Sequence, residues 1–475
     1  MTVDVPARIA PADELGQVHF VGIGGAALSG IARVMTMRGI RVSGSDQSDS
    51  SMLQSLRTLG IRCWVGHDPA HVEGADTVVV STAVRDDNPE VLRARELGLR
   101  LWPRSAAVQS VLSGHRAVVV TGTHGKTTTT SMLTTALLAT DADPSYAIGS
   151  TLTASGLNAA AGSGDVFVVE GDESDGAILT YSPAGAVITN VDVDHLDHFG
   201  TAAAYAEVFY SFLGRIQPAG FVVCCVDDAG AALVADRALQ RGLVTIRVGF
   251  ADGTDLQAVR CTFAGETSQF DVRRGDETLG RVTLRVPGQH YIIDALAALA
   301  AGLELGYAFD ELARGLAAFR GSGRRMEFKG EAAGVRVFDS YAHHPVEIAA
   351  DLAAARVVAG AGRLVACFQP HLFSRTKAFA VQMGAALGAA DEVVVMDVYG
   401  SREDPDPSVN GVKVADAVPL AAGHVAFVGD WSQTSAEVAG RAHTGDLVIT
   451  LGAGDVTEIG PAVIALLEQR TRCSW

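Results

Sequence analysis

The residues best suited to phosphate chemistry lie in one short segment, residues 117–130, with the sequence AVVVTGTHGKTTTT. An apolar β-branched run is followed by two glycines and then by a stretch compatible with a helix. A strand, a glycine turn and a helix start together form an anion site, because backbone N–H groups and the helix dipole favour negative charge. Lys126 is placed to reach terminal phosphates, and the hydroxyl of Thr127 is placed to hold Mg²⁺.

The spacing of this segment differs from the phosphate-loop pattern GxxxxGK[ST]. The first glycine would be residue 120, which is Val120, so a shortened GTHGKT loop is the better description. A threonine-rich helix cap that binds nothing is the alternative. Lysine usage favours a phosphate site, because Lys126 is the only lysine before Lys329. The predicted loop residues are Gly122, Thr123, His124, Gly125, Lys126, Thr127 and Thr128.

Two later apolar runs, residues 166–169 and 186–189, read as buried strands that end in polar residues. Because the carboxyl ends of parallel strands share one edge, Glu170 and His195 are expected beside the phosphate loop. A strand-end carboxylate next to such a loop is a typical Mg²⁺ partner, and a solvated cap is the alternative. Other polar residues that follow these strands are Asp172, Glu173, Asp175, Asn190, Asp192 and Asp194, of which the first three stay ambiguous.

The segment before the loop, residues 17–46, reads as strand, glycine turn, helix and strand. Gly22, Gly24 and Ala27 fit the pattern G-x-G-x-x-A, and Asp46 follows Gly24 by 22 residues, where an acid can bond a ribose hydroxyl. The pattern predicts binding of a nucleotide diphosphate without saying which one. Glycines that serve only tight packing are the alternative. Further strand–helix units, with His67 and Ser81 at strand ends, complete a Rossmann-like unit.

Beyond the central strands, residues 220–285 alternate strand-like runs with polar turns, which suggests antiparallel additions. A long helix is then predicted, with His290, Tyr291 and Asp294 in its first turn. The Gly/Arg-rich segment 319–328 marks a boundary. Its paired Arg324 and Arg325 are usual in a solvated linker and would also suit a phosphate clamp.

In the C-terminal part of the chain, apolar strands are again followed by polar residues. The segment VRVFDSYAHHPVEI places Asp339, Tyr341 and His343 after a strand, and FQPHLFSRTK places Arg375 after another. Metal or substrate contact is one reading of the two adjacent histidines, and a structural pair is the other. Arg375 is a candidate carboxylate anchor or an ordinary surface arginine. The sequence thus predicts an α/β chain of three consecutive domains: Rossmann-like at 1–113, a phosphate-loop domain with a parallel or mixed sheet at 114–325, and Rossmann-like again at 326–475.

Composition narrows the class of protein. The net charge of −17 argues against nucleic-acid binding, which needs a basic face. The six cysteines show no zinc spacing, and neither a signal peptide nor an uninterrupted apolar run of membrane-spanning length is present. We therefore expect a cytoplasmic protein with reduced thiols that binds neither nucleic acid nor membrane.

Five motifs together carry a family resemblance. GTHGKTTT, VEGDESD, TNVDVDH, DSYAHHP and FQPH–SRT occur in the order and spacing typical of a Mur ligase, and the glycine-rich start GIGGAALSGIA extends the similarity from about residue 17 to residue 460. The resemblance implies that the carboxylate of UDP-N-acetylmuramate attacks the γ-phosphate of ATP. The resulting acyl phosphate is then attacked by the amine of L-alanine. ATP and Mg²⁺ are the implied cofactors, and a monomer or weak homodimer is expected.

The resemblance also implies roles for individual residues. Thr127 and Glu170 would hold one Mg²⁺, and His195 would help to hold a second, with no lysine between residues 127 and 328 to be carbamylated as in several sister ligases. The implied catalytic residues are Lys126, Glu170, His195, His343 and Arg375, of which His343 and Arg375 also receive the amino acid. The implied ATP contacts beyond the loop are His290, Tyr291, Asp294, Arg325, Asp339 and Tyr341. The implied contacts to the UDP-substrate are Gly22, Gly24, Gly25, Asp46, His67, Ser81 and Asn190.

The chain departs from the family pattern in two places. His290, Tyr291 and Asp294 stand where the family often has HNxxN, and Leu372 stands where it often has an arginine. Three other functions remain as alternatives: a sibling ligase that attaches a recycled tripeptide to the same UDP-sugar, an NAD-dependent oxidoreductase, and a nucleotide-binding protein without catalysis.

Overall fold

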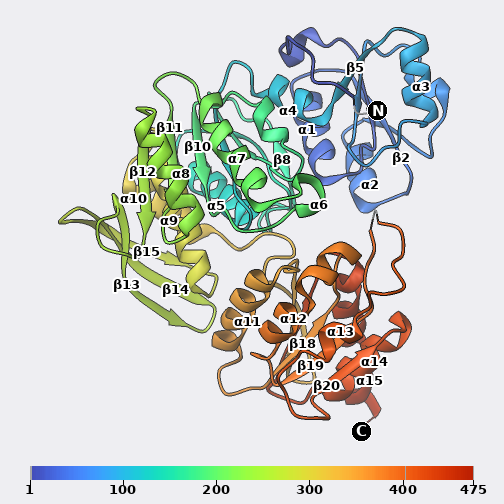
Figure 1. Cartoon of the computed structure of the whole chain (residues 1–475), viewed down its shortest axis with the longest axis vertical. Helices are drawn as coiled ribbons and strands as arrows, with labels where there is room; N and C mark the ends of the chain where they lie inside the picture. The colour runs from blue at the N-terminus through green and yellow to red at the C-terminus, as the bar shows by residue number, and fades with distance from the viewer. Residues whose placement is uncertain (1–2, 402, 474–475) are drawn as a thin grey trace. The chain divides into compact units, whose positions relative to one another are not determined.

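The computed structural model describes residues 3–401 and 403–473 of the 475-residue chain. The chain groups into two compact units. One holds the chain up to Val259 together with Asp271–Val282 and Ile293–Phe319; the other holds Arg260–Phe270, Thr283–Ile292 and the chain from Arg320 onward. Three β-sheets follow one another along the sequence, so the predicted succession of three α/β domains is confirmed (Figure 1).

The first sheet has five parallel strands in the order β3-β2-β1-β4-β5, which is the predicted Rossmann-like arrangement. Its strands are β1 (Val18–Val21), β2 (Val42–Asp46), β3 (Arg62–Val65), β4 (Thr77–Val80) and β5 (Arg100–Pro103). Its helices are α1 (Ala26–Met37), α2 (Ser51–Thr58), α3 (Pro89–Glu96) and α4 (Arg104–Leu112). Strands β1 and β4 are buried along their whole length, as expected for apolar runs covered by helices on both faces.

The second sheet has ten strands in the order β15-β14-β13-β12-β11-β10-β6-β9-β7-β8. They are β6 (Arg116–Thr121), β7 (Ser145–Ala147), β8 (Ala159–Ala160), β9 (Val166–Glu170), β10 (Gly185–Ile188), β11 (Phe221–Cys225), β12 (Val244–Gly249), β13 (Leu256–Ala264), β14 (Thr267–Arg274) and β15 (Glu277–Leu284). Strands β7, β9, β6, β10, β11 and β12 are parallel, and β8 is antiparallel to β7. The mixed central sheet predicted from the sequence is therefore confirmed.

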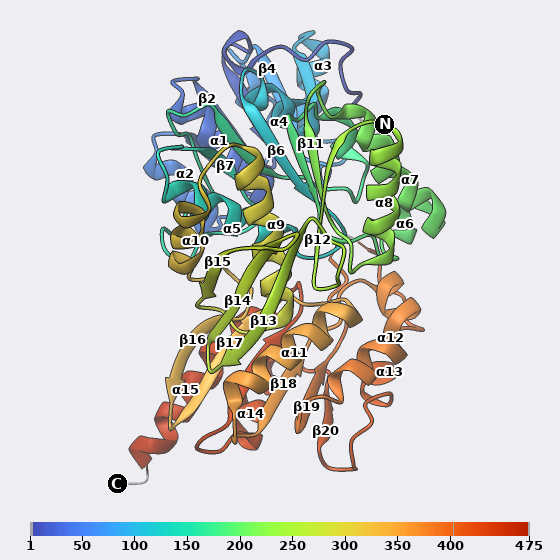
Figure 2. The same ribbon diagram turned by 90° about the vertical axis from the view of Figure 1, so that its left-hand side faces the viewer.

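Helices cover both faces of this second sheet. They are α5 (Lys126–Leu138), α6 (Leu196–Phe199), α7 (Ala202–Phe212), α8 (Ala229–Gln240), α9 (Gln289–Glu304) and α10 (Phe309–Ala318). Figure 2 shows α7 and α8 on one side of the sheet and α5, α9 and α10 on the other.

The prediction of antiparallel additions in residues 220–285 is wrong for β11, β12 and β13, since β13 also pairs in parallel with β12. Strand β11 is parallel to both β10 and β12. Between β11 and β12 the physical reason is helix α8, which was not predicted: a helical crossover returns the chain so that the next strand runs parallel.

A continuous apolar core joins the first sheet's helices to the second sheet. Residues from α1 and α4 belong to the same buried cluster as Phe167 of β9 and Tyr181. Polar contacts accompany it, since Asn158 Nδ2 donates to the carbonyl of Ala26 at 3.0 Å and Arg38 Nη2 donates to Oγ of Ser145 in β7 at 3.3 Å. Within this unit, the first domain is therefore fixed against the domain that carries the phosphate loop.

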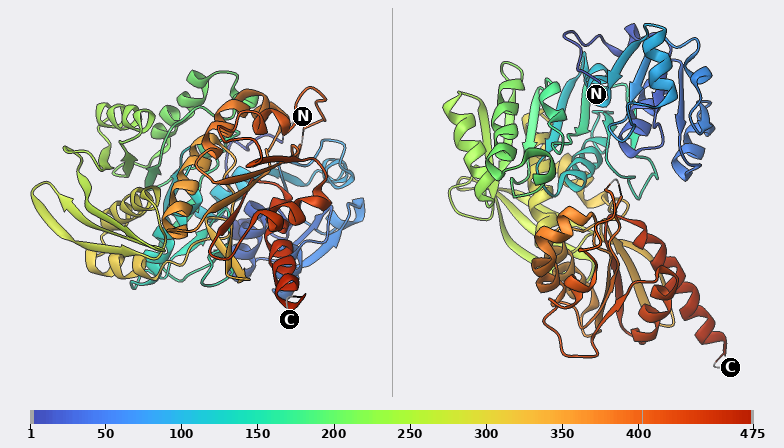
Figure 3. Two further views of the ribbon diagram at one scale, coloured as in Figure 1. Left: turned by 90° about the horizontal axis from the view of Figure 1, so that it is seen from below. Right: turned by 45° about the vertical axis from the view of Figure 1, so that its right-hand side comes forward.

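The third sheet has the order β16-β17-β21-β18-β19-β20, with β16 antiparallel and the others parallel. Its strands are β16 (Glu327–Ala332), β17 (Val335–Ser340), β18 (Leu364–Phe368), β19 (Glu392–Met396), β20 (Val425–Val428) and β21 (Leu447–Leu451). Its helices are α11 (Pro345–Ala359), α12 (Phe373–Leu387), α13 (Val412–Ala415), α14 (Trp431–Arg441) and α15 (Ile459–Cys473), the last drawn in red beside the C-terminus in Figure 3. Among the described residues, no helix combines the length and apolar character needed to cross a membrane.

Candidate active site

Two glycines in the phosphate loop occupy positions that no other residue could take without strain. Gly122 has a φ of +139°, and a Cβ there would lie 2.1 Å from Oγ1 of Thr189. Gly125 has a φ of +78°, and a Cβ there would lie 2.7 Å from Oδ1 of Asp294. Helix α5 begins directly afterwards at Lys126, so the loop delivers backbone N–H groups and a helix N-terminus to one point.

The loop is held from the end of the neighbouring strand β10. Asn190 Oδ1 accepts from the backbone N–H of His124 at 2.7 Å, and its Nδ2 donates to the carbonyl of the same residue at 3.0 Å. Thr189 Oγ1 also donates to that carbonyl, and the Thr123 hydroxyl accepts from the backbone N–H of Asp192 at 2.9 Å. Asn190, assigned to the UDP-substrate by resemblance, thus lies against the phosphate loop.

The ammonium group of Lys126 donates three hydrogen bonds to protein oxygen atoms. Its Nζ donates to the carbonyls of Gly122 at 2.7 Å and Thr123 at 3.0 Å, and to Oε1 of Glu173 at 3.0 Å. Burial lowers the pKa of Lys126, but the carboxylates of Glu173, Asp172 and Glu170 outweigh that effect and raise the pKa above its ordinary value. The lysine is therefore charged and lies at the loop, where a phosphate would exchange with one of its present partners.

Thr127 and Glu170 present two oxygen atoms side by side next to the loop. The Thr127 hydroxyl donates to Oε1 of Glu170 at 2.9 Å, while Oε2 accepts from the backbone N–H of Gly149 at 2.7 Å. Two neighbouring ligands of an octahedral Mg²⁺ with bonds of about 2.1 Å lie about 3 Å apart. The observed spacing and the all-oxygen donor set fit a magnesium ion. Thr128, the next loop residue, is buried in the first turn of α5.

His195 lies at the carboxyl end of β10 in a left-handed conformation with a φ of +52°. Its Nε2 is 3.5 Å from Oε1 of Glu173 and 3.7 Å from a carboxylate oxygen of Asp194. The structure thus brings Lys126 and His195 to the same buried carboxylate, that of Glu173.

The role of Glu173 was not predicted from the sequence, and neither were those of Tyr205 and Arg104, which contact the same acidic segment. The Tyr205 hydroxyl lies 3.0 Å from Oγ1 of Thr123 and 3.3 Å from Glu173. Arg104, from the first domain, donates to Asp172 at 2.9 Å and to Asp175 at 3.2 Å. The acidic run VEGDESD was visible in the sequence, but which of its acids turn inward depends on Tyr205 and Arg104, which are distant in the chain.

The carboxyl edge of the first sheet carries the residues predicted for the UDP-substrate. Gly22 has a φ of +83° and donates its N–H to the carbonyl of Ser45 at 2.8 Å. Gly24 donates its N–H to Oδ2 of Asp46 at 2.8 Å, and Gly25 caps helix α1. Asp46 is thus a partner of the glycine turn. His67 follows β3 and Ser81 follows β4 on the same edge.

In the other unit, Asp339 is fully buried and saturated by hydrogen bonds. It accepts from the hydroxyls of Thr450 at 2.6 Å and Thr457 at 2.7 Å, and from Nε of Arg324 at 3.0 Å. The guanidinium of Arg325 lies 5.1 Å from the ring centre of Tyr341. Arg324 is thus a structural residue of this edge, while Arg325 lies beside the tyrosine that the resemblance assigns to the nucleotide.

The residues predicted to bind the amino-acid substrate, His343 and Arg375, also lie at this edge. The ring centres of His343 and His371 are 5.6 Å apart, and an Nη atom of Arg375 is 3.2 Å from Nδ1 of His371. Leu372, between them in sequence, is buried with a φ of +69°. Its apolar side chain offers no bond to a carboxylate, and Arg375 is the arginine or lysine nearest to it in sequence.

Three of the residues implied to contact ATP, His290, Tyr291 and Asp294, lie in different surroundings. Asp294 belongs to the unit that holds the phosphate loop, where it accepts from Thr129 Oγ1 at 3.1 Å. His290 and Tyr291 belong to the other unit; burial lowers the pKa of His290 to about 4, and Tyr291 is buried. Asp294 therefore braces the glycine turn of the phosphate loop.

Comparisons with known proteins agree with this architecture domain by domain. The family model "Mur ligase family, catalytic domain" matches residues 17–116, "Mur ligase middle domain" matches residues 120–302, and "Mur ligase, glutamate ligase domain" matches residues 324–454. A UDP-N-acetylmuramate–L-alanine ligase from a Nocardioides species is 58% identical over 98% of this chain and 100% of its own length.

Solved structures give the same picture. A UDP-N-acetylmuramate–alanine ligase from Thermotoga maritima superposes with a TM-score of 0.81 at 28% identity, over 97% of this chain and 100% of that chain. A murein peptide ligase from Psychrobacter arcticus superposes with a TM-score of 0.71 at 24% identity, over 95% of this chain and 99% of that chain, and shares the fold.

Proposed function

The chain belongs to the Mur ligase family, and we propose that it joins L-alanine to the carboxylate of UDP-N-acetylmuramate while ATP is converted to ADP and phosphate. The observation that carries the proposal is the phosphate loop with a charged Lys126 and the adjacent Thr127–Glu170 oxygens, in a chain 58% identical over its length to a ligase of that name. The product is a precursor of peptidoglycan.

The reaction proceeds in two steps. A carboxylate oxygen of the muramoyl group attacks the γ-phosphorus of ATP, the bond to the bridging oxygen breaks, and an acyl phosphate and ADP result. The alanine amine then attacks the acyl carbon, and the tetrahedral intermediate expels inorganic phosphate as the amide forms. The ammonium of Lys126 and the N-terminus of α5 stabilise the negative charge that develops on the transferred phosphoryl group.

Thr127 and Glu170 are the residues that would hold Mg²⁺, whose positive charge would neutralise phosphate oxygens. Asn190 and Asp294 keep the loop in shape, the first through His124 and the second through Thr129. Arg375 and His343 would receive the carboxylate and the amine of alanine. We further propose a cytoplasmic location and a monomeric or weakly dimeric state.

Release of inorganic phosphate with UDP-N-acetylmuramate, ATP and Mg²⁺ tests the proposal. The assay compares four acceptors: L-alanine, glycine, L-serine and the recycled tripeptide. We expect release to be fastest with L-alanine. Activity with the tripeptide alone would replace the proposal by the sibling ligase, and an NAD-linked absorbance change without any need for ATP would replace it by an oxidoreductase.

A further inference from the structure

A buried carboxylate in the first domain, that of Glu90, has several polar partners. Glu90, in the first turn of α3, is fully buried. Its Oε2 accepts from the Ser45 hydroxyl at 2.5 Å and lies 3.1 Å from Nδ1 of His67. Its Oε1 lies 2.6 Å from Nδ1 of His71 and 3.4 Å from the backbone N–H of Asp68. The carboxylate thus connects α3 to the ends of β2 and β3.

Glu90 is ionised. Burial raises the pKa of its carboxyl, but the nearby His19 ring, the Ser45 hydroxyl and His71 outweigh this and bring the pKa to about 2. Nε2 of His19 lies 3.7 Å from Oε2. The N-terminus of α3 adds a favourable dipole. A carboxylate that is charged and fully buried accepts hydrogen bonds and cannot donate them.

The position of the proton on His67 follows from this geometry. Nδ1 of His67 has two neighbours, Oε2 of Glu90 at 3.1 Å and the Ser45 oxygen at 3.0 Å. Glu90 is an acceptor, and the Ser45 proton is directed to Glu90, so both neighbours are acceptors towards Nδ1. Nδ1 therefore carries hydrogen, and in the neutral ring Nε2 is left as an acceptor. The His67 side chain is 19% exposed, so part of the ring faces solvent.

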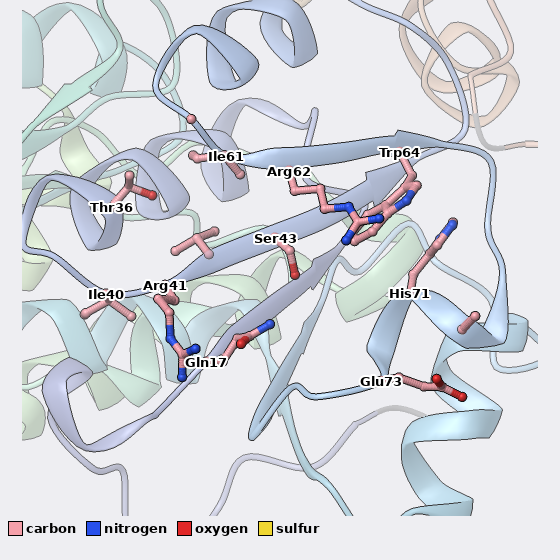
Figure 4. A pocket seen from close by; sticks show the side chains of 13 residues that line it. Gln17, Thr36, Ile40, Arg41, Ser43, Ile61, Arg62, Trp64, His71 and Glu73 are labelled. Carbon is pink, nitrogen blue, oxygen red and sulfur yellow. The ribbon is translucent and has the colours of Figure 1, made fainter.

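The other end of the cluster packs against aromatic and cationic side chains. His71 stacks on Trp64 with ring centres 4.4 Å apart, and the Arg62 guanidinium lies 4.6 Å from the Trp64 ring centre. Figure 4 shows these three side chains together at one end of a pocket of about 520 Å³. Oε1 of Glu90 contacts the stacked ring of His71, and this contact orients the carboxylate so that Oε2 faces Ser45 and His67.

Ser45 extends the connection to the glycine turn. Its carbonyl accepts from the N–H groups of Gly22 at 2.8 Å and Ile23 at 3.0 Å, while its hydroxyl is held by Glu90. Ser45 therefore contacts the turn after β1 through its carbonyl and the Glu90 carboxylate through its hydroxyl, on the edge where a nucleotide diphosphate would bind.

We propose that Glu90 is a positioning residue for the UDP-substrate: it keeps hydrogen on Nδ1 of His67, so that Nε2 accepts a hydrogen bond from a hydroxyl or base N–H of the uridine. The inference rests on the proposed function for the identity of the ligand. The position of the proton is a property of the ligand-free chain and does not depend on it.

Nitrogen NMR of ¹⁵N-histidine-labelled full-length protein at pH 8 tests the first half. Loss of one signal set in His67→Gln assigns the ring. We expect the wild type to show hydrogen on Nδ1 and a bare Nε2, and Glu90→Gln to move hydrogen to Nε2. Glu96→Gln, an exposed acid of the same helix paired with Arg93, should change nothing. Hydrogen on Nε2 of His67 in the wild type, alone or with Nδ1, overturns the proposal.

Calorimetric binding of UDP-N-acetylmuramate tests the second half. Glu90→Gln and His67→Gln should each weaken binding about tenfold, the equivalent of one hydrogen bond. The double variant should be no weaker than His67→Gln, and ATP affinity should be unchanged in all three. Losses that multiply, or a parallel loss of ATP affinity, would mean that Glu90 serves only the fold. A wild type that ignores the UDP-sugar contradicts the proposed function and the substrate role of Glu90, while the NMR result still decides the position of the proton.

Discussion

The pairing of Lys126 with Glu173 predicts an unusual result for their double variant. Each side chain is the main charged partner of the other, at 3.0 Å, with Glu173 fully buried and Lys126 only 18% exposed. Removal of one partner strands a charge in a poorly solvated place. Removal of both partners leaves no unpaired charge there. Lys126→Ala/Glu173→Ala should therefore resist unfolding better than Lys126→Ala, although it lacks both side chains.

The structure sets the size of the effect. Lys126→Ala leaves the Glu173 carboxylate with the Tyr205 hydroxyl and the His195 ring, so its cost belongs in the range of about 3–5 kcal/mol for a broken buried pair. Glu173→Ala costs less, about 2 kcal/mol, since Lys126 keeps two backbone carbonyls and partial access to water. The double variant should cost about 2–3 kcal/mol less than the sum of the single variants.

Native-state hydrogen exchange, read by mass spectrometry, is the suitable assay because the tryptophans among the described residues, Trp64, Trp102 and Trp431, lie outside the central sheet. Peptides that cover β6 and α5 report the local opening free energy. Additive losses, or a double variant less protected than Lys126→Ala, would refute the inference that the two charges depend on each other. In Glu173→Ala the pKa of Lys126 should also fall, because its largest favourable contribution is removed.

Further predictions concern the loop and the core. Lys126→Ala should abolish phosphate release and leave UDP-substrate affinity nearly intact, while Lys413→Ala, an exposed lysine, should retain full turnover; turnover that survives Lys126→Ala would contradict the loop assignment. Gly125→Ala should lose ATP binding, because a left-handed alanine costs about 1–2 kcal/mol and its Cβ would lie 2.7 Å from Asp294; unchanged calorimetric affinity for ATP would count against this. Burial raises the pKa of Cys367 to about 12, so its thiol should resist an aromatic disulfide reagent at pH 8 until the chain is unfolded. Since the folded pKa exceeds the unfolded value of about 8.5, the contribution of this thiol to stability is complete below pH ~8.5 and declines as pH rises toward 12; fast labelling of the native protein would be inconsistent with it.

Local features of the chain were predictable from sequence because local sequence determines them. The run of β6, the two glycines and the start of α5 form one strand–turn–helix unit, which predicts the loop, and the parallel sheet predicts that Glu170 lies beside Thr127. The parallel direction of β12 was missed because α8 is rich in alanine and shows few large apolar residues for a periodicity argument.

The roles of Glu173 and Glu90 could not be predicted for a different reason. An acid in an acidic chain is usually solvated, and only the folded structure shows that Tyr205 closes over Glu173 and that three histidines surround Glu90. Burial of a charge is a property of residues that are distant in sequence, so local pattern does not reveal it. The role of Asn190 could not be predicted from local pattern either, because its side-chain amide bonds with the backbone of His124 in the loop.

The fate of one oxygen atom tests the central claim most directly. UDP-N-acetylmuramate labelled with ¹⁸O in its muramoyl carboxylate is incubated with the protein, ATP, Mg²⁺ and L-alanine, and the inorganic phosphate is analysed by mass spectrometry. If the carboxylate attacks the γ-phosphorus, one labelled oxygen appears in each phosphate released, and the UDP-sugar gains the mass of alanine less that of one ¹⁸O-labelled water molecule. Phosphate that carries no label, or label without gain of alanine, would contradict the account.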